Sequence, residues 1–306
     1  MVSHSEAENI AVIGLGSMGL GMARSLVRAG LDVSGCDLDS AALESLEASD
    51  GHPFTTPAEA CGNADIVVVV VVNAAQTESV LFGQDGAVAA MKPGSVIISS
   101  ATMSPADAKG LAARAAERGI HYLDAPISGG AAKADEGKLT VMASGPPEAF
   151  AAAKPALDAM AETVYELGDA VGIGSSFKIV NQLLAGVHIA AACEAITFAK
   201  SLDLDISKVF EVITKSAGNS WMFENRMQYV LAGDYAPRSA VSIFTKDLGI
   251  VSDLGRKQKF PLPIASAALQ LFVMTEAAGM GGDGDTSVAR LLARIAGLEL
   301  PGMEED

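Results

Sequence analysis

The sequence predicts an α/β fold: a doubly wound, mainly parallel sheet in residues 1–172, followed by an all-α domain in residues 173–306. Two observations carry this prediction. Up to residue 167, short β-branched runs alternate with amphipathic helical segments, as in the repeating units of a parallel sheet. After a glycine-rich segment at residues 168–174, apolar residues recur only at helical spacing. We therefore expect two domains, and 306 residues are enough to give each a core.

The elements of the first domain are predicted from local patterns and caps. The run at residues 66–72 is apolar throughout, which is typical of a central parallel strand buried on both faces. Ser40 and Pro105 are typical of helix starts. The predicted strands cover residues 9–13, 31–36, 54–56, 65–72, 95–99, 122–124, 139–144 and 163–167. The predicted helices cover residues 18–28, 40–48, 104–118 and 148–160.

The second domain is predicted from one long apolar segment and five further helical ones. Residues 175–201 are apolar on most sides, so we expect this helix to be buried, in part against a second copy of the chain. A homodimer or homotetramer is therefore expected. The other predicted helices cover residues 207–216, 219–231, 244–257, 263–278 and 287–296.

Composition limits the partners and the compartment. A formal net charge of −16 argues against nucleic acid and anionic membrane surfaces as partners. Three widely spaced cysteines predict no disulfide or zinc framework, and no His or Cys cluster has metal-ligand spacing, so we expect no metal. Residues 1–9 are polar and lack the apolar run of a secretory signal. These features predict a cytoplasmic protein that acts on a small molecule.

A glycine-rich turn follows the first predicted strand and opens a helix. It consists of Gly14, Leu15, Gly16, Ser17, Met18 and Gly19, with the spacing G-x-G-x-x-G. The first glycine permits a tight turn, the second lets the backbone approach a pyrophosphate, and the third lets helix and strand pack closely. Free N–H groups at the helix start favour an anion. This Rossmann-type arrangement predicts a dinucleotide site.

The residues after the next strands bear on the same site. Asp37 ends the second predicted strand, about 20 residues after the turn, where an acid holds the ribose hydroxyls. Its carboxylate would repel a 2′-phosphate, and residues 38–40 contain no Arg, so NAD is favoured over NADP. Asn73 follows the strand at 65–72, at the edge where ligands bind in such sheets. The alternative is an ordinary βα turn with a surface Asp.

Three later segments are distinctive: D-A-P-I-S-G-G at 124–130, G-S-S-F-K-I-V-N at 174–181 and K-D-L at 246–248. Together with the glycine turn, and in this order, they resemble the β-hydroxyacid dehydrogenase family over nearly the whole chain. That family includes 3-hydroxyisobutyrate and tartronate semialdehyde dehydrogenases. Residues 218–226 and 237–241 most resemble its L-threonate dehydrogenase branch.

Lys178 is the candidate for proton transfer. It lies in an apolar helical segment four residues after Gly174, where a charged side chain is unusual unless it has a partner or a function. A lysine whose ammonium reaches solvent or pairs with an acid is the alternative. The resemblance matches Lys178 to the family's catalytic lysine, which takes the hydroxyl proton during oxidation and returns it during reduction. Asn181, one turn later, would orient the hydroxyl or the lysine; a helix-face amide bonded to the backbone is its alternative.

The resemblance also assigns binding residues. Ser128, Gly129 and Gly130 would bind the substrate, since a hydroxyl and unobstructed N–H groups suit a carboxylate. Lys246 would reach both cofactor and substrate, whereas Asp247 beside it is expected to be a surface partner. Thr102 would contact the nicotinamide ribose, with helix capping near residue 104 as the alternative. Residues 99–102 read S-S-A-T where the family often has D-M-S-T, so the contacts of this loop are open.

The resemblance implies an oxidoreductase that transfers a hydride between NAD and a small hydroxy acid. L-Threonate, oxidised at its C2 hydroxyl, is the first candidate, and 3-hydroxyisobutyrate and tartronate semialdehyde are alternatives. A 6-phosphogluconate-type substrate is disfavoured because no clustered cations suit a phosphate. Imine reduction on the same scaffold is disfavoured by Lys178. The alternative of another class is an NAD-binding regulatory protein without turnover, which has no need of the pair Lys178 and Asn181.

Overall fold

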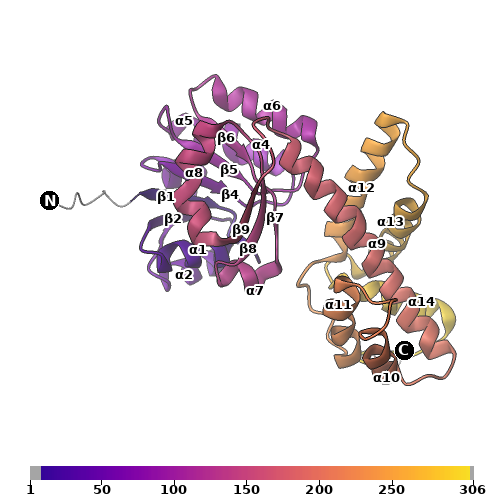
Figure 1. Cartoon of the computed structure of the whole chain (residues 1–306). Coiled ribbons are helices and arrows are strands. Elements are labelled where there is room, and N and C mark those ends of the chain that lie inside the picture. Colours follow the sequence, from indigo (N-terminus) through magenta and orange to yellow (C-terminus); the bar gives the residue numbers. More distant parts are fainter. Residues whose placement is uncertain (1–7, 304–306) are drawn as a thin grey trace. The chain divides into compact units, whose positions relative to one another are not determined.

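The computed structural model describes residues 8–303 (Figure 1). Residues 1–7, on which the expectation of no secretory signal partly rests, lie outside this range. The chain divides into two compact units, Met1–Lys178 and Ile179–Asp306, called here the N-terminal unit and the helical unit. The predicted division after residue 172 concerns functional domains and stays a prediction.

The N-terminal unit contains the predicted doubly wound sheet. Its six strands are parallel, and the spatial order is β3 (His52–Phe54), β2 (Asp32–Cys36), β1 (Asn9–Ile13), β4 (Ile66–Val69), β5 (Val96–Ser99) and β6 (His121–Asp124). The order reverses between β1 and β4, so the segments that follow these two strands flank the switch point. Ligands bind at the carboxyl ends of the strands beside such a point. The predicted α/β class is confirmed.

Helices cover both faces of this sheet (Figure 1). One face packs against α1 (Gly19–Arg28), α2 (Ser40–Glu47) and α8 (Pro147–Met160). The other packs against α3 (Pro57–Cys61), α4 (Ala74–Phe82), α5 (Ala87–Ala90) and α6 (Pro105–Ala116). Pro105 begins α6 as predicted, but α2 is capped by Asp39, whose side chain accepts a hydrogen bond from the Ala41 amide, and not by Ser40.

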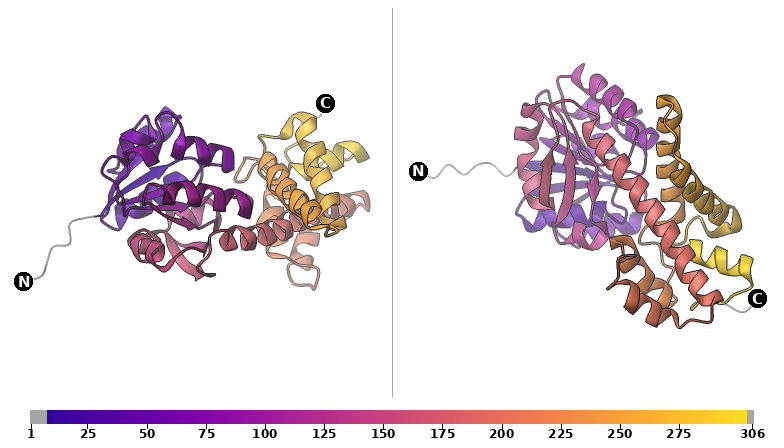
Figure 2. Two further views of the ribbon diagram at one scale, coloured as in Figure 1. Left: turned by 90° about the horizontal axis from the view of Figure 1, so that it is seen from above. Right: turned by 45° about the vertical axis from the view of Figure 1, so that its right-hand side comes forward.

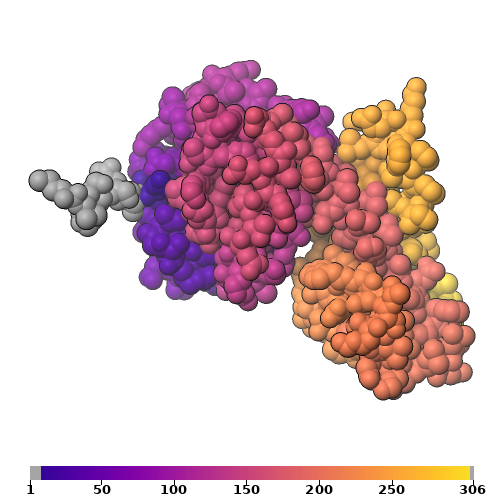
Figure 3. All heavy atoms as spheres, in the orientation of Figure 1, coloured from indigo at the N-terminus to yellow at the C-terminus, as the bar shows by residue number. Residues whose placement is uncertain are grey.

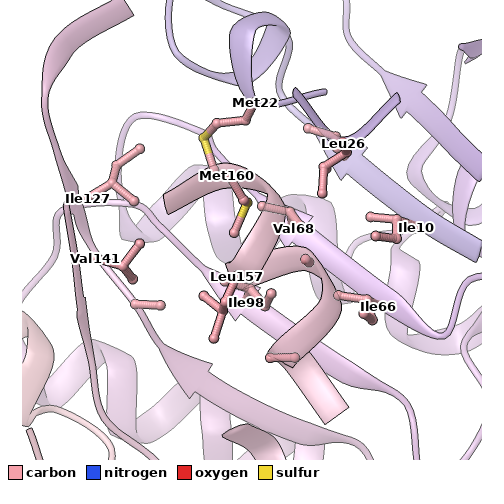
Figure 4. Close-up of a cluster of buried hydrophobic side chains, with 14 of the residues drawn as sticks. Ile10, Met22, Leu26, Ile66, Val68, Ile98, Ile127, Val141, Leu157 and Met160 are labelled. Atoms are coloured by element: carbon pink, nitrogen blue, oxygen red, sulfur yellow. The ribbon is translucent and has the colours of Figure 1, made fainter. Parts of the chain in front are cut away.

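The core follows from the alternation of side chains along the buried strands. In β1, Ile10 and Val12 join one core cluster, whereas Ala11 and Ile13 join the other. Figure 4 shows the first cluster, where Met22, Leu26, Leu157 and Met160 of α1 and α8 meet Ile10, Ile66, Val68 and Ile98. In Figure 3 the pink atoms of α8 and the strand after it cover this side. Each such buried side chain contributes roughly 1.5–3 kcal/mol.

A second, smaller sheet differs from the prediction. The segments predicted as strands at 139–144 and 163–167 do not extend the large sheet. They form β8 (Leu139–Ala143) and β9 (Ala161–Glu166), which pair with the two-residue β7 (Ile127–Ser128) in the order β7-β8-β9. The β7–β8 pair is antiparallel because the chain reverses through two glycines and the short α7 (Gly130–Asp135). This reversal places Ser128 and the glycines after it in a tight turn.

Every named element of the helical unit is a helix, as predicted (Figure 2). The unit begins within α9 (Ile173–Ser201), whose first residues belong to the N-terminal unit. The elements that follow are α10 (Ile206–Ile213), α11 (Trp221–Ala232), α12 (Val241–Gln258), α13 (Pro263–Thr275), the π-turn η1 (Glu276–Met280) and α14 (Ser287–Ala296). Its core includes Phe244 and Phe272, whose rings stack with centroids 5.2 Å apart.

Helix α9 is only partly buried within the chain. Its most apolar 18 residues have a mean hydropathy of 1.5, and half of them are buried. By length and composition the helix could cross a membrane, but the core helix of a soluble protein has the same properties. Four large apolar side chains on it are exposed, namely Phe177, Val180, Leu184 and Phe198. The expected burial is therefore incomplete in a single copy of the chain.

Candidate active site

The glycine turn after β1 has the geometry that its sequence predicts. Gly14 has φ +92°, which L side chains rarely adopt. A Cβ on Gly19 would lie 1.8 Å from the carbonyl oxygen of Gly14, so α1 approaches the strand as only glycine allows. A Cβ on Gly16 would meet no protein atom within 4 Å. The protein itself does not require glycine at this position, whereas the close approach of a bound pyrophosphate would require it.

Asp37 lies against this turn. One carboxylate oxygen, Oδ2, accepts a hydrogen bond of 2.5 Å from the Leu15 amide, and Oδ1 accepts one of 2.9 Å from the Asp39 amide. These bonds fix the carboxylate at the carboxyl end of β2, where a ribose diol would bind. A surface pocket of about 560 Å³ lies beside the turn, lined by residues including Gly16, Ser17 and Asp39. The geometry thus fits a dinucleotide.

Asn73 and Thr102 lie in the loops that follow β4 and β5. The β4 loop adjoins the turn, because a Cβ on Gly14 would lie 3.0 Å from the Val70 carbonyl oxygen. Asn73 caps α4, since its Oδ1 accepts a 2.8 Å hydrogen bond from the Gln76 amide. Ser104 caps α6, which leaves Thr102 without that task. Both loops are therefore placed at the cofactor edge, and contact of either residue with the cofactor stays a prediction.

Lys178 lies in the second turn of α9, and only 8% of its surface is exposed. Its Nζ donates a 2.8 Å hydrogen bond to the carbonyl oxygen of Ile127. Ile127 directly precedes Ser128, so the structure brings the predicted proton-transfer group to the predicted substrate segment. The two are about 50 residues apart in the chain, and nothing in local pattern places them together.

The substrate segment itself is a backbone turn that requires glycine. Gly129 has φ +142° and Gly130 has φ +81°, both in the region that disfavours other residues. Gly130 begins α7, so N–H groups at this end have no partner within the helix. With the half-buried Ser128 beside them, they can donate hydrogen bonds to a carboxylate near the Lys178 amine.

Asp124 supports this arrangement, a role that no local sequence pattern predicted. Its side chain is 1% exposed and accepts hydrogen bonds from the amides of Gly172 and Ser175 at 2.9 and 2.8 Å. The hydroxyls of Ser175 and Ser144 donate to it as well, at 2.7 and 3.4 Å. The carboxylate thereby caps the helix that carries Lys178. Burial raises the pKa of Asp124, although these hydrogen bonds oppose the rise.

In the helical unit, Asn181 and Lys246 are joined through two other polar residues. Asn181 Nδ2 donates a 3.0 Å hydrogen bond to Gln182 Oε1, and Gln182 Nε2 donates one of 2.5 Å to Asp247 Oδ2. The Lys246 ammonium lies 2.9 Å from Asp247 Oδ1. Asp247 is 2% exposed, so the expectation that it is a surface partner is wrong. Its burial is possible because it forms an ion pair with Lys246 and accepts a hydrogen bond from the side-chain amide of Gln182.

Two features of the described residues complete the picture. Within residues 8–303, no three His, Cys, Asp or Glu side chains gather as a metal would need. Asp124 and Asp247, for which no site role was predicted, belong to the distinctive segments 124–130 and 246–248. Their place in those motifs is the signal that could have identified them. Their distant partners could not be inferred, since Gly172 and Ser175 lie 48 and 51 residues from Asp124, and Gln182 lies 65 residues from Asp247.

Two family models match the two parts of the chain. Residues 9–168 match a family described as the NAD binding domain of 6-phosphogluconate dehydrogenase. Residues 172–292 match one described as "NAD-binding of NADP-dependent 3-hydroxyisobutyrate dehydrogenase". Both matched families therefore concern the binding of a nicotinamide dinucleotide.

Individual relatives extend the match over nearly the whole chain. An L-threonate dehydrogenase of Cupriavidus necator is 52% identical over 98% of this chain and 100% of that protein. One from Pectobacterium atrosepticum is 48% identical over 97% of both. A crystal structure described as 3-hydroxyisobutyrate dehydrogenase from Salmonella typhimurium has 49% identity and a TM-score of 0.89, over 93% of this chain and 99% of that one.

Proposed function

Because the chain belongs to the 3-hydroxyisobutyrate dehydrogenase-like family of β-hydroxyacid dehydrogenases, we propose that it oxidises L-threonate at its C2 hydroxyl with NAD. The protein is a nicotinamide-dependent hydroxy-acid dehydrogenase. The observation that supports the proposed site best is the hydrogen bond between Lys178 Nζ and the Ile127 carbonyl, which places the amine beside Ser128.

In the proposed reaction, Ser128, Gly129 and Gly130 bind the substrate carboxylate through a hydroxyl and backbone N–H groups. Lys178, as a neutral amine, takes the proton of the C2 hydroxyl. NAD, when bound, would supply the acceptor for the hydride of the same carbon, so that loss of both proton and hydride leaves a 2-keto acid. In the reverse direction the ammonium of Lys178 returns the proton. Asn181 and Lys246 are proposed to bind the same substrate, and Lys246 the cofactor as well.

Substitution of Lys178 by Met tests the proton-transfer role. Lys178→Met should lower turnover roughly 10²–10⁴-fold, because the hydroxyl proton loses its acceptor. Affinity for NAD should be unchanged, since the glycine turn and Asp37 are intact. Turnover is measured by NADH absorbance, and affinity by titration of the protein's fluorescence with NADH.

Lys208→Met is the matched control, because Lys208 is an exposed residue of α10 that pairs with Glu211. It should leave both quantities unchanged. If Lys178→Met retains wild-type turnover, the lysine has no part in the reaction.

NAD is proposed as the cofactor because of the charges at the carboxyl end of β2. Asp37 accepts hydrogen bonds there and Asp39 caps α2, so two carboxylates face the position of a 2′-phosphate. Leu38 between them is fully exposed and offers no positive charge. The matched description of residues 172–292 names an NADP-dependent enzyme, so the preference needs its own test.

The double change Asp37→Ala with Leu38→Arg should move the ratio of kcat/KM for NAD over NADP toward NADP. The repulsion is removed and a guanidinium is offered to the phosphate. Steady-state kinetics with both cofactors measure the ratio. Asp158→Ala, on the exposed face of α8, is the control and should leave it unchanged. An unchanged ratio in the double variant would show that residue 37 does not contact the ribose.

The substrate within the hydroxy-acid class is tested with a panel. L-Threonate, 3-hydroxyisobutyrate and tartronate semialdehyde share a carboxylate and an alcohol or aldehyde group, and the relatives' names include the first two. We expect the highest kcat/KM with L-threonate. A higher value with 3-hydroxyisobutyrate would move the assignment to that substrate.

As a dehydrogenase of this family the protein is soluble, and we propose that it works in the cytoplasm as a homodimer or homotetramer. Three free, buried cysteines support a reducing compartment. The exposed apolar side chains of α9 support an assembly, since a second copy would cover them. Light scattering after gel filtration should give twice or four times the chain mass of 31.2 kDa. The exclusion of nucleic acid and membranes stays a prediction.

A further inference from the structure

The chain of polar side chains in the helical unit has a direction. It runs from Asn181 through Gln182 and Asp247 to Lys246, and its two middle members are buried. An ionised carboxylate only accepts hydrogen bonds, and an ammonium only donates them. Asp247 therefore forms an ion pair with Lys246 through Oδ1 and accepts a hydrogen bond from the amide NH₂ of Gln182 on Oδ2.

Asp247 orients the side-chain amides of both Gln182 and Asn181. Because the NH₂ of Gln182 faces Asp247, its carbonyl oxygen Oε1 faces Asn181. Asn181 can satisfy that oxygen only with its own NH₂, and Nδ2 lies 3.0 Å away. Among the described residues this is the hydrogen bond that the Asn181 side chain makes, and the residue is half-buried. Its carbonyl oxygen Oδ1 is thus left as an acceptor.

We propose that Gln182 and Asp247 are positioning residues, which hold the Asn181 amide so that Oδ1 accepts a hydrogen bond from a hydroxyl of the substrate. The inference rests on the proposed function, which supplies a hydroxy acid as the ligand. A carboxylate has no hydrogen to donate, so an acceptor in this orientation selects a hydroxyl and rejects the acid group. Asn181 then contributes to recognition of the alcohol end of the substrate.

The test compares two ligands on one variant. Gln182→Met keeps the side-chain length but removes both polar atoms, so the Asn181 amide is free to rotate. The KM for L-threonate should rise about tenfold, the loss of roughly one hydrogen bond. The KM for NAD should stay unchanged. The inhibition constant of butanoate, which has the carboxylate without any hydroxyl, should also stay unchanged.

The matched control is Gln228→Met. Gln228 is exposed on α11 and donates to the backbone oxygen of Asn225, so the same chemical change there should leave all three constants at their wild-type values. A rise of the butanoate constant in Gln182→Met equal to that for L-threonate would show that Asn181 binds the carboxylate. No change in either constant would show that the chain does not orient Asn181. Both results overturn the proposal.

Asp247→Asn is a second variant for the case that Gln182→Met does not fold. An amide at 247 can donate to Gln182 Oε1, so Gln182 can turn and present its NH₂ to Asn181. The same hydroxyl-selective loss is expected. If the wild type oxidises no hydroxy acid, the proposed function fails. The orientation is then still tested by the side-chain ¹⁵N resonance of Asn181, which should shift in Gln182→Met and not in Gln228→Met.

Discussion

The carboxylate of Asp124 links the large sheet to the start of α9. It ends β6, and it accepts hydrogen bonds from the amides of Gly172 and Ser175, which no residue within the helix can satisfy. Lys178 follows one turn later, and its amine is held by Ile127. At the scale of single residues, the position of the proposed proton-transfer group thus depends on two acceptors that lie three residues apart in the chain.

The buried state of Asp124 predicts a pH dependence of stability. Its pKa is raised on folding because burial disfavours the charged form. A raised pKa means that its contribution is fully present below the unfolded pKa of about 3.9 and is lost as pH rises through the folded pKa. The free energy of unfolding of wild type minus that of Asp124→Asn should therefore fall as pH increases. Urea unfolding at several values between pH 4 and 7 measures it.

Asp205→Asn is the control for this experiment. Asp205 also caps a helix, α10, but its side chain is exposed, so the same substitution there accounts for the loss of a capping carboxylate without its burial. If the free energy of unfolding of wild type minus that of Asp124→Asn instead grows with pH, the four hydrogen bonds to Asp124 outweigh its burial. The pKa of Asp124 is then lowered on folding and not raised.

At the scale of elements, the strand–turn–helix unit of β1 and α1 assigns different tasks to its glycines. Gly19 is required by the protein, since a side chain there would collide with the backbone of Gly14. Gly16 is not, because a Cβ there would meet open space. Substitution of the two by alanine therefore separates folding from cofactor binding.

Gly16→Ala should keep the melting temperature of the wild type and weaken NAD binding, because the added methyl obstructs the approach of the pyrophosphate. Gly19→Ala should lower the melting temperature by several degrees, since helix and strand must separate. Differential scanning fluorimetry and NADH titration measure the two effects. Wild-type NAD affinity in a well-folded Gly16→Ala protein would remove the turn from the binding site.

The sequence was informative about these elements where the pattern is local. The strands of the large sheet other than β3, the glycine turn and the helices after residue 175 follow from periodicity and caps, whereas β3 lies at His52–Phe54 and not at the predicted residues 54–56. The small sheet did not follow, because Ile127 and Ser128 form a strand only through pairing with Val141 and Thr140. Likewise, Asp247 looked like a surface residue because its partner Gln182 lies 65 positions away. Contacts between distant segments decide such cases, and one sequence does not contain them.

At the scale of the whole molecule, the two compact units have separate cores. The clusters on both faces of the large sheet belong to the N-terminal unit, whereas a third cluster around Phe244 and Phe272 belongs to the helical unit. The glycine turn and Asp37 both lie in the N-terminal unit. Cofactor binding at these residues, as proposed, would therefore stabilise that unit directly.

In calorimetry of the intact chain, NAD should therefore raise the unfolding temperatures of the two units by unequal amounts. NAD at 100 times its dissociation constant should stabilise the transition of the N-terminal unit by about 2.7 kcal/mol and raise its temperature, with a smaller effect on the helical unit. Gly16→Ala should abolish the shift at the same concentration. Equal shifts of all transitions would indicate that the units unfold together.

The peptide oxygen that anchors Lys178 is electrically neutral throughout the working pH range. It accepts a hydrogen bond from an ammonium and from an uncharged amine alike, because the amine still has two N–H bonds after it gives up a proton. In the proposed reaction the side chain gains one proton and releases it once per turnover. The hydrogen bond to Ile127 is kept when the proton is gained and when it is released, so each new round of catalysis begins with the amine already in place.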